Sequence, residues 1–216
     1  MNNVGTACDL PARFLNGEHA SQRNESLLNV NLVSMTKMCE LVLPAMERRR
    51  RGLVINISSS SSLIPSPLLS VYAATKAYMN KLNECLAAEY RSRGVVFALL
   101  PVWLVSTNMT HNLATDDSSW WAVVPSAERY VRSALASIRH QESFQSTGYW
   151  PHALLGMAMA SVQMVLSSRL LSHGMIWYFA KLRKYIRLRE QCSGEDGGNS
   201  SASPVRLSVM KVIKMQ

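Results

Sequence analysis

A tyrosine and a lysine four positions apart are the residues of this sequence best suited to chemistry. Tyr72 and Lys76 lie in the segment YAATK. On a helix, positions i and i+4 share a face, so the phenol and the ammonium are expected to be neighbours. A nearby positive charge favours the phenolate, so Lys76 is expected to lower the pKa of Tyr72 from its ordinary value of about 10. Tyr72 is therefore a candidate general acid or base.

Two polar residues upstream strengthen this interpretation, because surface tyrosines and lysines at this spacing are common. Ser59 directly follows the apolar run LVINIS, which predicts a buried strand. Because α/β folds place ligand-binding groups where strands end, the Ser59 hydroxyl is expected to hold a carbonyl oxygen beside Tyr72. Asn31 lies in the preceding helical pattern and is expected to fix a water or a backbone bend near Lys76.

Hydrophobic periodicity predicts the elements that must position these side chains. In order, we expect a helix over residues 25–46, a strand over 53–58, a helix over 72–93, a strand over 95–100, a helix over 126–140 and helical structure over 151–190. Pro44 is expected to bend the first helix, Gly94 to end the second, and Pro101 to close the second strand. Helices alternating with short apolar strands predict an α/β fold with a parallel sheet.

Composition narrows the range of partners. The chain has 216 residues, 48% of them hydrophobic and 17% charged, with a net charge of +9, which suits one globular domain or a protein that touches a membrane. The basic cluster at 48–51 is either a solvated helix end or a site for acidic partners. The cluster at 181–189 follows an apolar stretch, so anionic lipid headgroups are an alternative to solvent there.

Cys39 and Cys85 are expected to be buried free thiols; no metal site and no nucleic-acid partner is predicted.

Five segments follow one another in the order and with the spacing of a known enzyme family. They are residues 2–5 (NNVG), 30–32 (VNL), 56–59 (NISS), 72–76 (YAATK) and 100–101 (LP). Together they resemble the short-chain dehydrogenase/reductase (SDR) family. The stretches LVLPAMERRRRGLVINISSSSSLIPSPLLSVYAATKAY, AAEYRSRGV and STGYWPHALLG resemble its 17β-hydroxysteroid dehydrogenase type 3 and type 12 subfamily (type 12 being very-long-chain 3-oxoacyl-CoA reductase) or a related 20β-hydroxysteroid dehydrogenase. The resemblance covers roughly residues 1–190.

The resemblance implies hydride transfer between NADP(H) and a ketone or hydroxyl of a steroid or long-chain 3-oxoacyl-CoA. Tyr72 would then donate the proton to the carbonyl oxygen, and Ser59 would hydrogen-bond that oxygen. Lys76 would lower the pKa of Tyr72 and contact the nicotinamide ribose, and Asn31 would support a proton relay. The same resemblance does not identify the ketone, the preference between NAD and NADP, or the direction of reaction.

The resemblance also assigns cofactor contacts and predicts a gap. Besides Tyr72 and Lys76, the expected cofactor-binding residues are Asn3, Gly5, Pro101 and Thr107. The SDR pattern opens with a strand and a glycine-rich turn that receives the pyrophosphate, and none of the ten glycines forms that turn. We therefore expect the C-terminal part of a Rossmann-like, doubly wound parallel sheet, N-terminally truncated, without the first three strands and the turn, and with weak cofactor binding.

The expected organisation has three parts. Residues 1–150 would form a truncated SDR catalytic domain, 151–191 an apolar and then basic helical segment, and 192–216 a disordered tail. The resemblance implies attachment to the cytosolic face of the endoplasmic reticulum membrane. It also implies pairing through helices 24–48 and 72–93, as a homodimer or with a full-length SDR subunit. The alternative to an enzyme is a non-catalytic SDR-like protein that acts through this pairing or through membrane binding.

Overall fold

The computed structural model describes residues 1–7, 10–15, 19–107, 110, 123–139 and 146–195. Its elements are α1 (Ala20–Leu28), the π-helix η1 (Asn29–Val33), α2 (Ser34–Arg48), β1 (Gly52–Ser59), the 3-10 turn η2 (Ser60–Ser62), α3 (Ser70–Tyr90), the 3-10 turn η3 (Arg91–Arg93), β2 (Val95–Val102), α4 (Ala127–Arg139), α5 (Trp150–Val165) and α6 (Ser168–Glu195). The expected alternation of helices and strands is confirmed, and the two strands are each slightly longer than predicted.

The sheet is parallel, as predicted. β1 and β2 pair in register from Gly52 opposite Val95 to Ser59 opposite Val102. The chain start adds a short parallel bridge: Asn2 N donates to Ile55 O at 2.8 Å, and Ile57 N donates to Asn2 O at 3.1 Å. Because parallel strands end at the same edge of a sheet, β1 and β2 bring Ser59 and Val102 together at the carboxyl edge.

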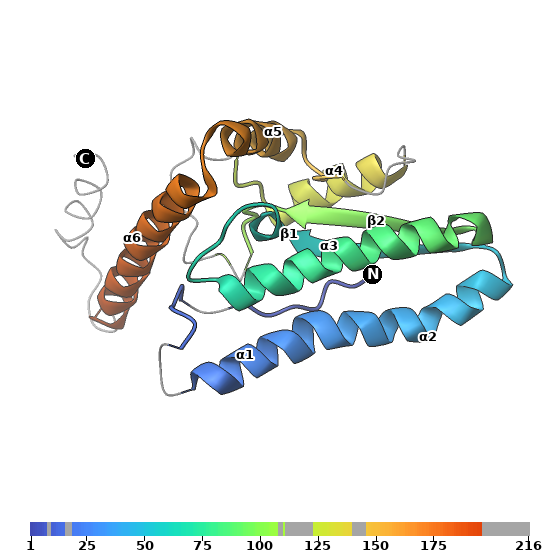
Figure 1. Ribbon diagram of the computed structural model, residues 1–216, viewed down its shortest axis with the longest axis horizontal. Helices are drawn as coiled ribbons and strands as arrows, with labels where there is room; N and C mark the ends of the chain where they lie inside the picture. Colours follow the sequence, from blue (N-terminus) through green and yellow to red (C-terminus); the bar gives the residue numbers. More distant parts are fainter. Residues whose placement is uncertain (8–9, 16–18, 108–109, 111–122, 140–145, 196–216) are drawn as a thin grey trace.

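Helices cover both faces of this sheet. The α1–α2 helix and α3 lie side by side on one face, and α4 lies on the other (Figure 1). The first face holds a core of Cys39, Leu43, Val54, Ala87, Val95 and Phe97. The second holds Leu100, Val105, Tyr130, Ala134 and Tyr149, with Ile55 and Ile57 packed against them. This is the layering of a doubly wound α/β fold.

Alternation along β1 explains why it bears polar residues on a buried face. Val54, Asn56 and Ser58 are all buried, whereas Ile55 and Ile57 between them point to the α4 side. Asn56 and Ser58 hydrogen-bond to α3, which satisfies their polar groups away from water. Ile55 and Ile57 therefore pack into the core on the α4 side, whereas Asn56 and Ser58 tie the strand to α3.

Gly94 fixes the connection between α3 and β2, as the sequence predicts. Its φ is +74°, and a Cβ at this position would lie 2.2 Å from the Arg50 carbonyl oxygen. Only glycine tolerates both the left-handed backbone and this close approach. The turn after α2 and the turn after α3 therefore lock together at the amino edge of the sheet.

Three expectations are corrected. The first helix begins at Ala20 and is interrupted by the π-helix η1, in which Asn31 lies. Cys85 is exposed rather than buried, because it lies on the solvent side of α3, whereas Cys39 is buried as expected. α6 runs to Glu195, so the tail does not begin at residue 192. The predicted disorder of residues 196–216 concerns residues outside those described.

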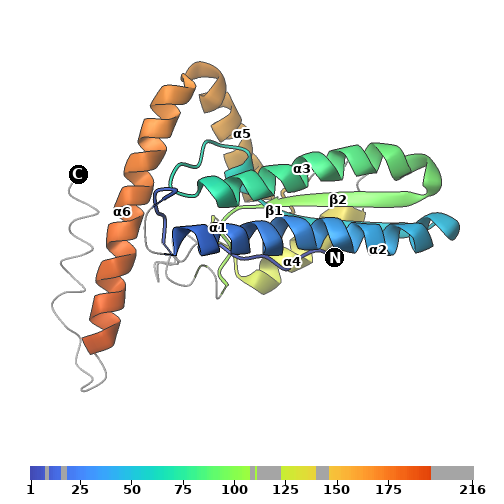
Figure 2. The ribbon, with the colours of Figure 1, turned by 60° about the horizontal axis from the view of Figure 1, so that its bottom comes forward.

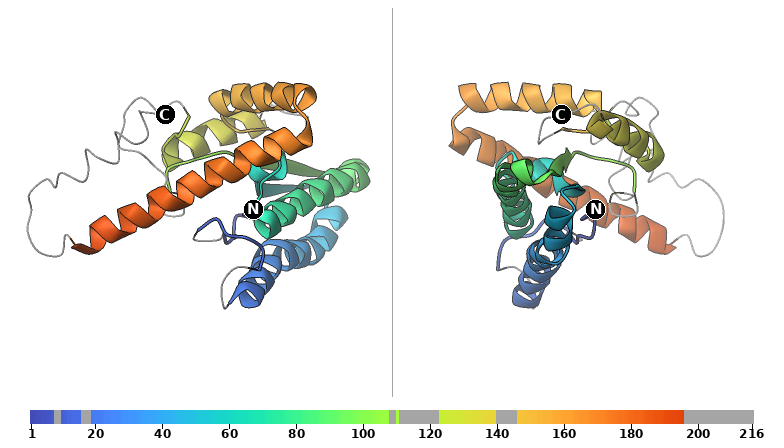
Figure 3. Two further views of the ribbon diagram at one scale, coloured as in Figure 1. Left: turned by 60° about the vertical axis from the view of Figure 1, so that its left-hand side comes forward. Right: turned by 90° about the vertical axis from the view of Figure 1, so that its right-hand side faces the viewer.

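The C-terminal helices project from the sheet layers. α5 and α6 form a V, and α6 extends away from the body of the molecule (Figure 2; Figure 3, left). Helical structure over 151–190 is thus confirmed, with a break between Val165 and Ser168. Within the described part of the chain, no helix combines the length and the apolar character that crossing a bilayer requires.

Candidate active site

Ser59 and Tyr72 meet at the carboxyl edge of the sheet, as predicted. Ser59 is the last residue of β1, and Tyr72 lies in the first turn of α3. The Ser59 hydroxyl lies close enough to the Tyr72 phenol to act on its pKa as a hydrogen-bonding neighbour. Ser59 Oγ also accepts from Ser61 N at 3.2 Å and from Ser61 Oγ at 3.0 Å. These two bonds occupy the acceptor positions of the Ser59 hydroxyl, which leaves its single proton available for Tyr72.

The expectation that the pKa of Tyr72 is lowered is wrong. Burial raises the pKa of Tyr72, and the hydrogen bond with Ser59 opposes that rise. The Lys76 ammonium lies 5.8 Å from the centre of the Tyr72 ring and donates to Ile57 O at 3.0 Å. Because the ammonium binds a backbone carbonyl rather than the phenol oxygen, desolvation decides the ionisation of Tyr72. The phenol is therefore protonated at neutral pH.

Lys76 is itself buried, with 6% of its surface exposed. Burial lowers its pKa to about 8, because the charged form loses its hydration. At pH 7 most molecules still carry the positive charge. The side chain therefore places a cation one helical turn from Tyr72, on the same face of α3, as the sequence predicts.

Asn31 joins three segments of the chain. Its Nδ2 donates to Thr6 O at 2.8 Å, and its Oδ1 accepts from Thr6 N at 2.8 Å. Nδ2 also lies 3.3 Å from Thr75 Oγ1 in α3. A Cβ on Gly5 would lie 3.3 Å from Asn31 Oδ1 and 3.5 Å from Lys76 Nζ. Gly5 thus allows the chain start to approach both side chains closely, and the predicted role of Asn31 in a relay stays a prediction.

The remaining predicted cofactor residues have different surroundings. Pro101 is buried within β2, at the edge where Ser59 lies. Thr107 is exposed, and its backbone N donates to Thr110 Oγ1 at 3.0 Å. Asn3 is exposed beside the bridge that Asn2 makes to β1. The predicted contacts of these residues with a cofactor stay predictions, and the 216 residues contain no glycine-rich turn for a pyrophosphate.

Sequence reasoning missed a column of buried amides behind the site. Asn2 Nδ2 donates to Asn56 Oδ1 at 2.7 Å, and Asn56 Nδ2 donates to Asn83 Oδ1 at 2.8 Å. Asn56 and Asn83 are almost completely buried. The column joins the chain start, β1 and α3. The signal was available, since an asparagine within an apolar strand needs a buried partner.

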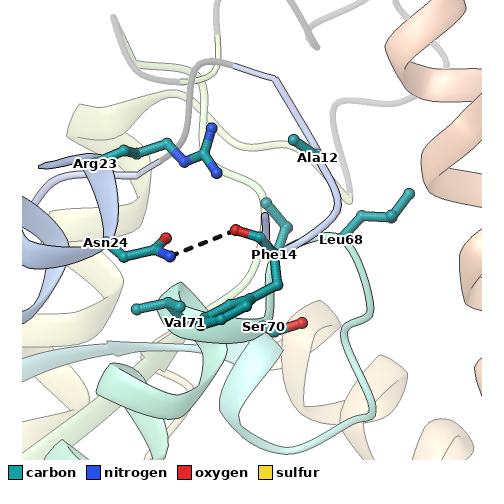
Figure 4. Close-up of a pocket in the computed structure, with 8 residues that line it drawn as sticks. Ala12, Phe14, Arg23, Asn24, Leu68, Ser70 and Val71 are labelled. Atoms are coloured by element: carbon teal, nitrogen blue, oxygen red, sulfur yellow. Dashed lines mark hydrogen bonds between the residues drawn. The ribbon is translucent and has the colours of Figure 1, made fainter. Parts of the chain in front are cut away.

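A small pocket lies beside the start of α3. It is lined by Ala12, Phe14, Arg23, Asn24, Leu68, Leu69, Ser70 and Val71. Figure 4 shows the Phe14 side chain next to Ser70 and Val71, the two residues that precede Tyr72, and Asn24 Nδ2 donates to Phe14 O at 3.5 Å. This part of the chain therefore forms a mixed polar and apolar wall near Tyr72.

A parallel sheet with helices on both faces and a Ser–Tyr–Lys cluster at its carboxyl edge defines a class of dinucleotide-dependent oxidoreductase folds. Residues 1–118 match the short chain dehydrogenase family. The chain belongs to this family.

Curated relatives narrow the resemblance to a subfamily. The chain is 36% identical over 163 residues to very-long-chain 3-oxoacyl-CoA reductase-B of Danio rerio, covering 75% of this chain and 50% of the relative. It is 35% identical over 193 residues to 17-beta-hydroxysteroid dehydrogenase type 3 of Danio rerio, covering 88% and 58%. The human very-long-chain 3-oxoacyl-CoA reductase is 36% identical over 75% of this chain. The chain spans about half the length of these relatives.

Solved structures support the fold. A short chain dehydrogenase from Burkholderia cenocepacia in complex with NADP is 19% identical, with a TM-score of 0.62 over 78% of this chain and 66% of that one. The bulky-bulky ketone specific alcohol dehydrogenase from Comamonas testosteroni is 19% identical, with a TM-score of 0.57 over 77% and 62%. At this identity the likeness shows the Rossmann-type fold alone.

Proposed function

We propose that this chain carries the proton-transfer side of an NADP(H)-dependent reductase that interconverts a ketone and a hydroxyl on a steroid or a long-chain 3-oxoacyl-CoA. The convergence of Ser59 at the end of β1 with Tyr72 and Lys76 on α3, at the carboxyl edge of the sheet, carries the proposal. Family membership supports the reaction class. The substrate class rests on the names of the relatives, and the cofactor on the NADP bound to a structural neighbour.

The chemistry of the cluster suits reduction. The pKa of Tyr72 is raised, so the phenol holds its proton at neutral pH and acts as the general acid toward the carbonyl oxygen. Ser59 turns its proton from Tyr72 to the same oxygen. The Lys76 cation stabilises the phenolate that forms, at the moment when charge develops. Bound NADP(H) would supply the hydride.

The test measures NADPH oxidation by the full chain, with a long-chain 3-oxoacyl-CoA and with a 17-ketosteroid. Millimolar NADPH is used because the chain has no glycine-rich turn and binding is expected to be weak. We expect Tyr72→Phe to lower the rate by about 10²–10⁴-fold, the usual contribution of a general acid. A rate that Tyr72→Phe leaves unchanged contradicts the proposal. A clear saturable thermal shift with NADPH at micromolar concentration contradicts the expected weak binding.

The alternative is a non-catalytic role through pairing, either as a homodimer or with a full-length SDR subunit. Two apolar side chains on α2 favour it: Met38 is 46% exposed and Leu41 is 72% exposed. Exposed apolar residues on a helix that packs against α3 mark a surface for another protein. A chain that stays monomeric by sedimentation, alone and mixed with a full-length relative, argues against this role.

We further propose that α5 and α6 attach the protein to the cytosolic face of the endoplasmic reticulum membrane. Leu170 and Trp177 on α6 are 62% and 60% exposed, and Lys181 Nζ lies 4.0 Å above the Trp177 ring. Apolar side chains followed by cations suit a helix that lies in the plane of the lipid headgroups. Binding to anionic vesicles tests this attachment.

A further inference from the structure

The polar stripe of α3 continues one turn beyond Lys76. Asn80 follows Lys76 by four positions, so it lies on the helix face that bears Tyr72 and Lys76. Its side chain is half-buried and reaches the loop after β1. Asn80 Nδ2 donates to Ser62 Oγ at 2.7 Å, and Asn80 Oδ1 accepts from Ser58 Oγ at 2.5 Å. One amide thus holds a residue on each side of Ser59.

Both contacts continue to the backbone near Ser59. Ser62 Oγ donates to Ser59 O at 2.5 Å, so Asn80 acts on the Ser59 backbone through one hydroxyl. Ser58 is 4% exposed, and its hydroxyl lies 3.2 Å from Lys76 O as well as close to Asn80. The Ser58 hydroxyl therefore finds an acceptor on α3 in either orientation. The end of β1 and the first turn of η2 are tied to α3 at two points.

This arrangement matters because the Ser59 side chain has no other anchor on α3 than Tyr72 among the hydrogen bonds of the described residues. Its two partners at Ser61 belong to the same short turn, so they move with it. A rotation of that turn would break the bond between Ser59 and Tyr72 and leave the partners at Ser61 intact. The contacts of Asn80 oppose this rotation, together with the contact of Ser58 Oγ with Lys76 O and the bond from Ser66 Oγ to Ser61 O.

We propose that Asn80 is a positioning residue that holds the Ser59 hydroxyl against Tyr72 by gripping Ser58 and Ser62. This inference rests on the proposed function, since it concerns the same proton-transfer pair. The Asn80 side chain makes no hydrogen bond with Ser59 or Tyr72 and acts only through Ser58 and Ser62. A side chain with a merely structural role would change the stability of the fold without changing the hydrogen bonding of the Tyr72 phenol.

Asn83 supplies a matched control. It lies on the same helix, is 1% exposed, and accepts from Asn56 Nδ2 of β1 at 2.8 Å. It therefore also ties β1 to α3 through a buried amide. Among the described residues, its side chain makes no hydrogen bond with η2, and Asn56 lies three positions before Ser59. A loss of stability alone would appear in Asn80→Ala and Asn83→Ala alike.

The experiment follows the ¹³Cζ resonance of Tyr72 at pH 7 in the full chain, labelled with ¹³Cζ-tyrosine and assigned with Tyr72→Phe. This resonance reports the hydrogen bonding of the phenol and needs neither cofactor nor substrate. Ser59→Ala defines the shift that complete loss of the bond produces. We expect Asn80→Ala to reproduce most of that shift, the double variant Ser59→Ala/Asn80→Ala to add nothing, and Asn83→Ala to leave the resonance in place.

Two milder variants keep the test decisive if Asn80→Ala does not fold. Ser62→Ala removes the path to the Ser59 backbone and leaves α3 untouched, so it should shift the resonance in the same direction. Asn80→Asp keeps an acceptor for Ser58 but has no donor for Ser62, so it should give an intermediate shift. A Tyr72 resonance that is unchanged in Ser62→Ala and in Asn80→Asp, while Ser59→Ala moves it, overturns the inference. So does a resonance that Ser59→Ala itself leaves in place.

The two proposals fail separately. If the NADPH assay shows no turnover that depends on Tyr72 but the resonance shifts as described, the reductase function fails and the positioning by Asn80 stands. If Tyr72→Phe abolishes turnover and the Asn80 variants leave the resonance unchanged, the positioning fails and the reductase function stands. In an active chain, Asn80→Ala should lower kcat more than it raises KM, because it misaligns the proton donor and leaves the substrate walls intact.

Discussion

The corner formed by β1, η2 and α3 and the pair α5–α6 are built on opposite principles. In the corner, polar side chains are buried and bond to partners far away in the sequence, as the amide column and the Asn80 contacts do. In α5 and α6, large apolar side chains are exposed: Trp150, Met157, Met164 and Val165 are 68%, 59%, 89% and 83% exposed. A hydrogen bond from Gln163 Nε2 to Leu63 O, at 3.0 Å, links α5 to the loop after η2.

The two regions therefore differ in whether their side chains are satisfied within the fold or left exposed. The corner satisfies its polar groups internally, so its geometry is fixed by the fold itself. α5 and α6 leave exposed more apolar surface in one region than soluble monomers usually do. Such a surface is typical of a site that binds a membrane or another protein. Changes in the corner should therefore cost stability, whereas changes at the exposed apolar positions of α5 and α6 should alter binding and leave stability almost unchanged.

The largest expected effect is in the amide column. Asn56→Ala removes the shared partner of Asn2 and Asn83 and leaves the buried Asn83 amide without its bond to β1. An unsatisfied buried amide together with the vacated volume should cost about 3 kcal/mol of unfolding free energy. Urea unfolding measures it. Asn3→Ala, at an exposed neighbour of Asn2, is the control and should change the value by less than about 0.5 kcal/mol. Equal losses in both variants would contradict the contrast drawn here.

The second effect concerns pH. The pKa of Lys76 is lowered from 10.5 to about 8 in the folded protein, so the unfolded chain binds more protons between these values. Stability should therefore rise with pH across this window, by about 2 kcal/mol between pH 8 and pH 10 from this group alone. The measurement compares the pH dependence of unfolding with that of Lys76→Met. A variant with the same slope as the original chain would show that the ammonium is not desolvated.

The third effect belongs to the C-terminal pair. Lys184→Gln removes an exposed charge from the basic half of α6 and should weaken binding to anionic vesicles by about 1 kcal/mol, roughly fivefold. Arg48→Gln, at the far end of α2, is the matched control and should bind as the original chain does. Vesicle flotation with and without an anionic lipid measures both. If Lys184→Gln and Arg48→Gln weaken vesicle binding equally, the net charge of the protein rather than α6 is responsible for the binding.

The smallest effect is expected for a substitution on the exposed side of α6, which should leave the stability of the fold almost unchanged. Leu170→Ser replaces a side chain that is 62% exposed on α6. Because little apolar surface leaves a core, the unfolding free energy should change by less than about 0.5 kcal/mol. Thermal unfolding checks this, and the same variant should bind vesicles more weakly because it loses apolar contact. A large drop in stability would place α6 in the core of the fold.

Much of the corner was predictable from local pattern. Apolar runs predicted both strands, and helical spacing predicted that Tyr72 and Lys76 share a face. The direction of the Tyr72 pKa was predicted wrongly, because it depends on how much water the fold removes rather than on the distance to Lys76 along the helix. Asn80 was overlooked although it extends the same spacing by one turn, because the path of the serine loop determines what its amide meets.

Other features required knowledge of distant contacts. The π-helix at Asn31 has no signature in residue types, since it accompanies a side chain that pairs with the backbone of Thr6. The exposure of Cys85 depends on how α3 is rotated about its axis on the sheet. Trp150 at the start of α5 is 68% exposed, and the placement of such an aromatic residue depends on surfaces that periodicity does not encode.

The bridge at Asn2 has a consequence for the order in which the chain folds. Asn2 and Asn56 are 54 positions apart, so joining them closes a long loop at an entropic cost that local helix formation does not bear. We expect β1, α3 and β2 to assemble first and the chain start to dock last. In native-state hydrogen exchange, the Ile57 amide, which donates to Asn2 O, should then open at a lower free energy than the amides shared by β1 and β2.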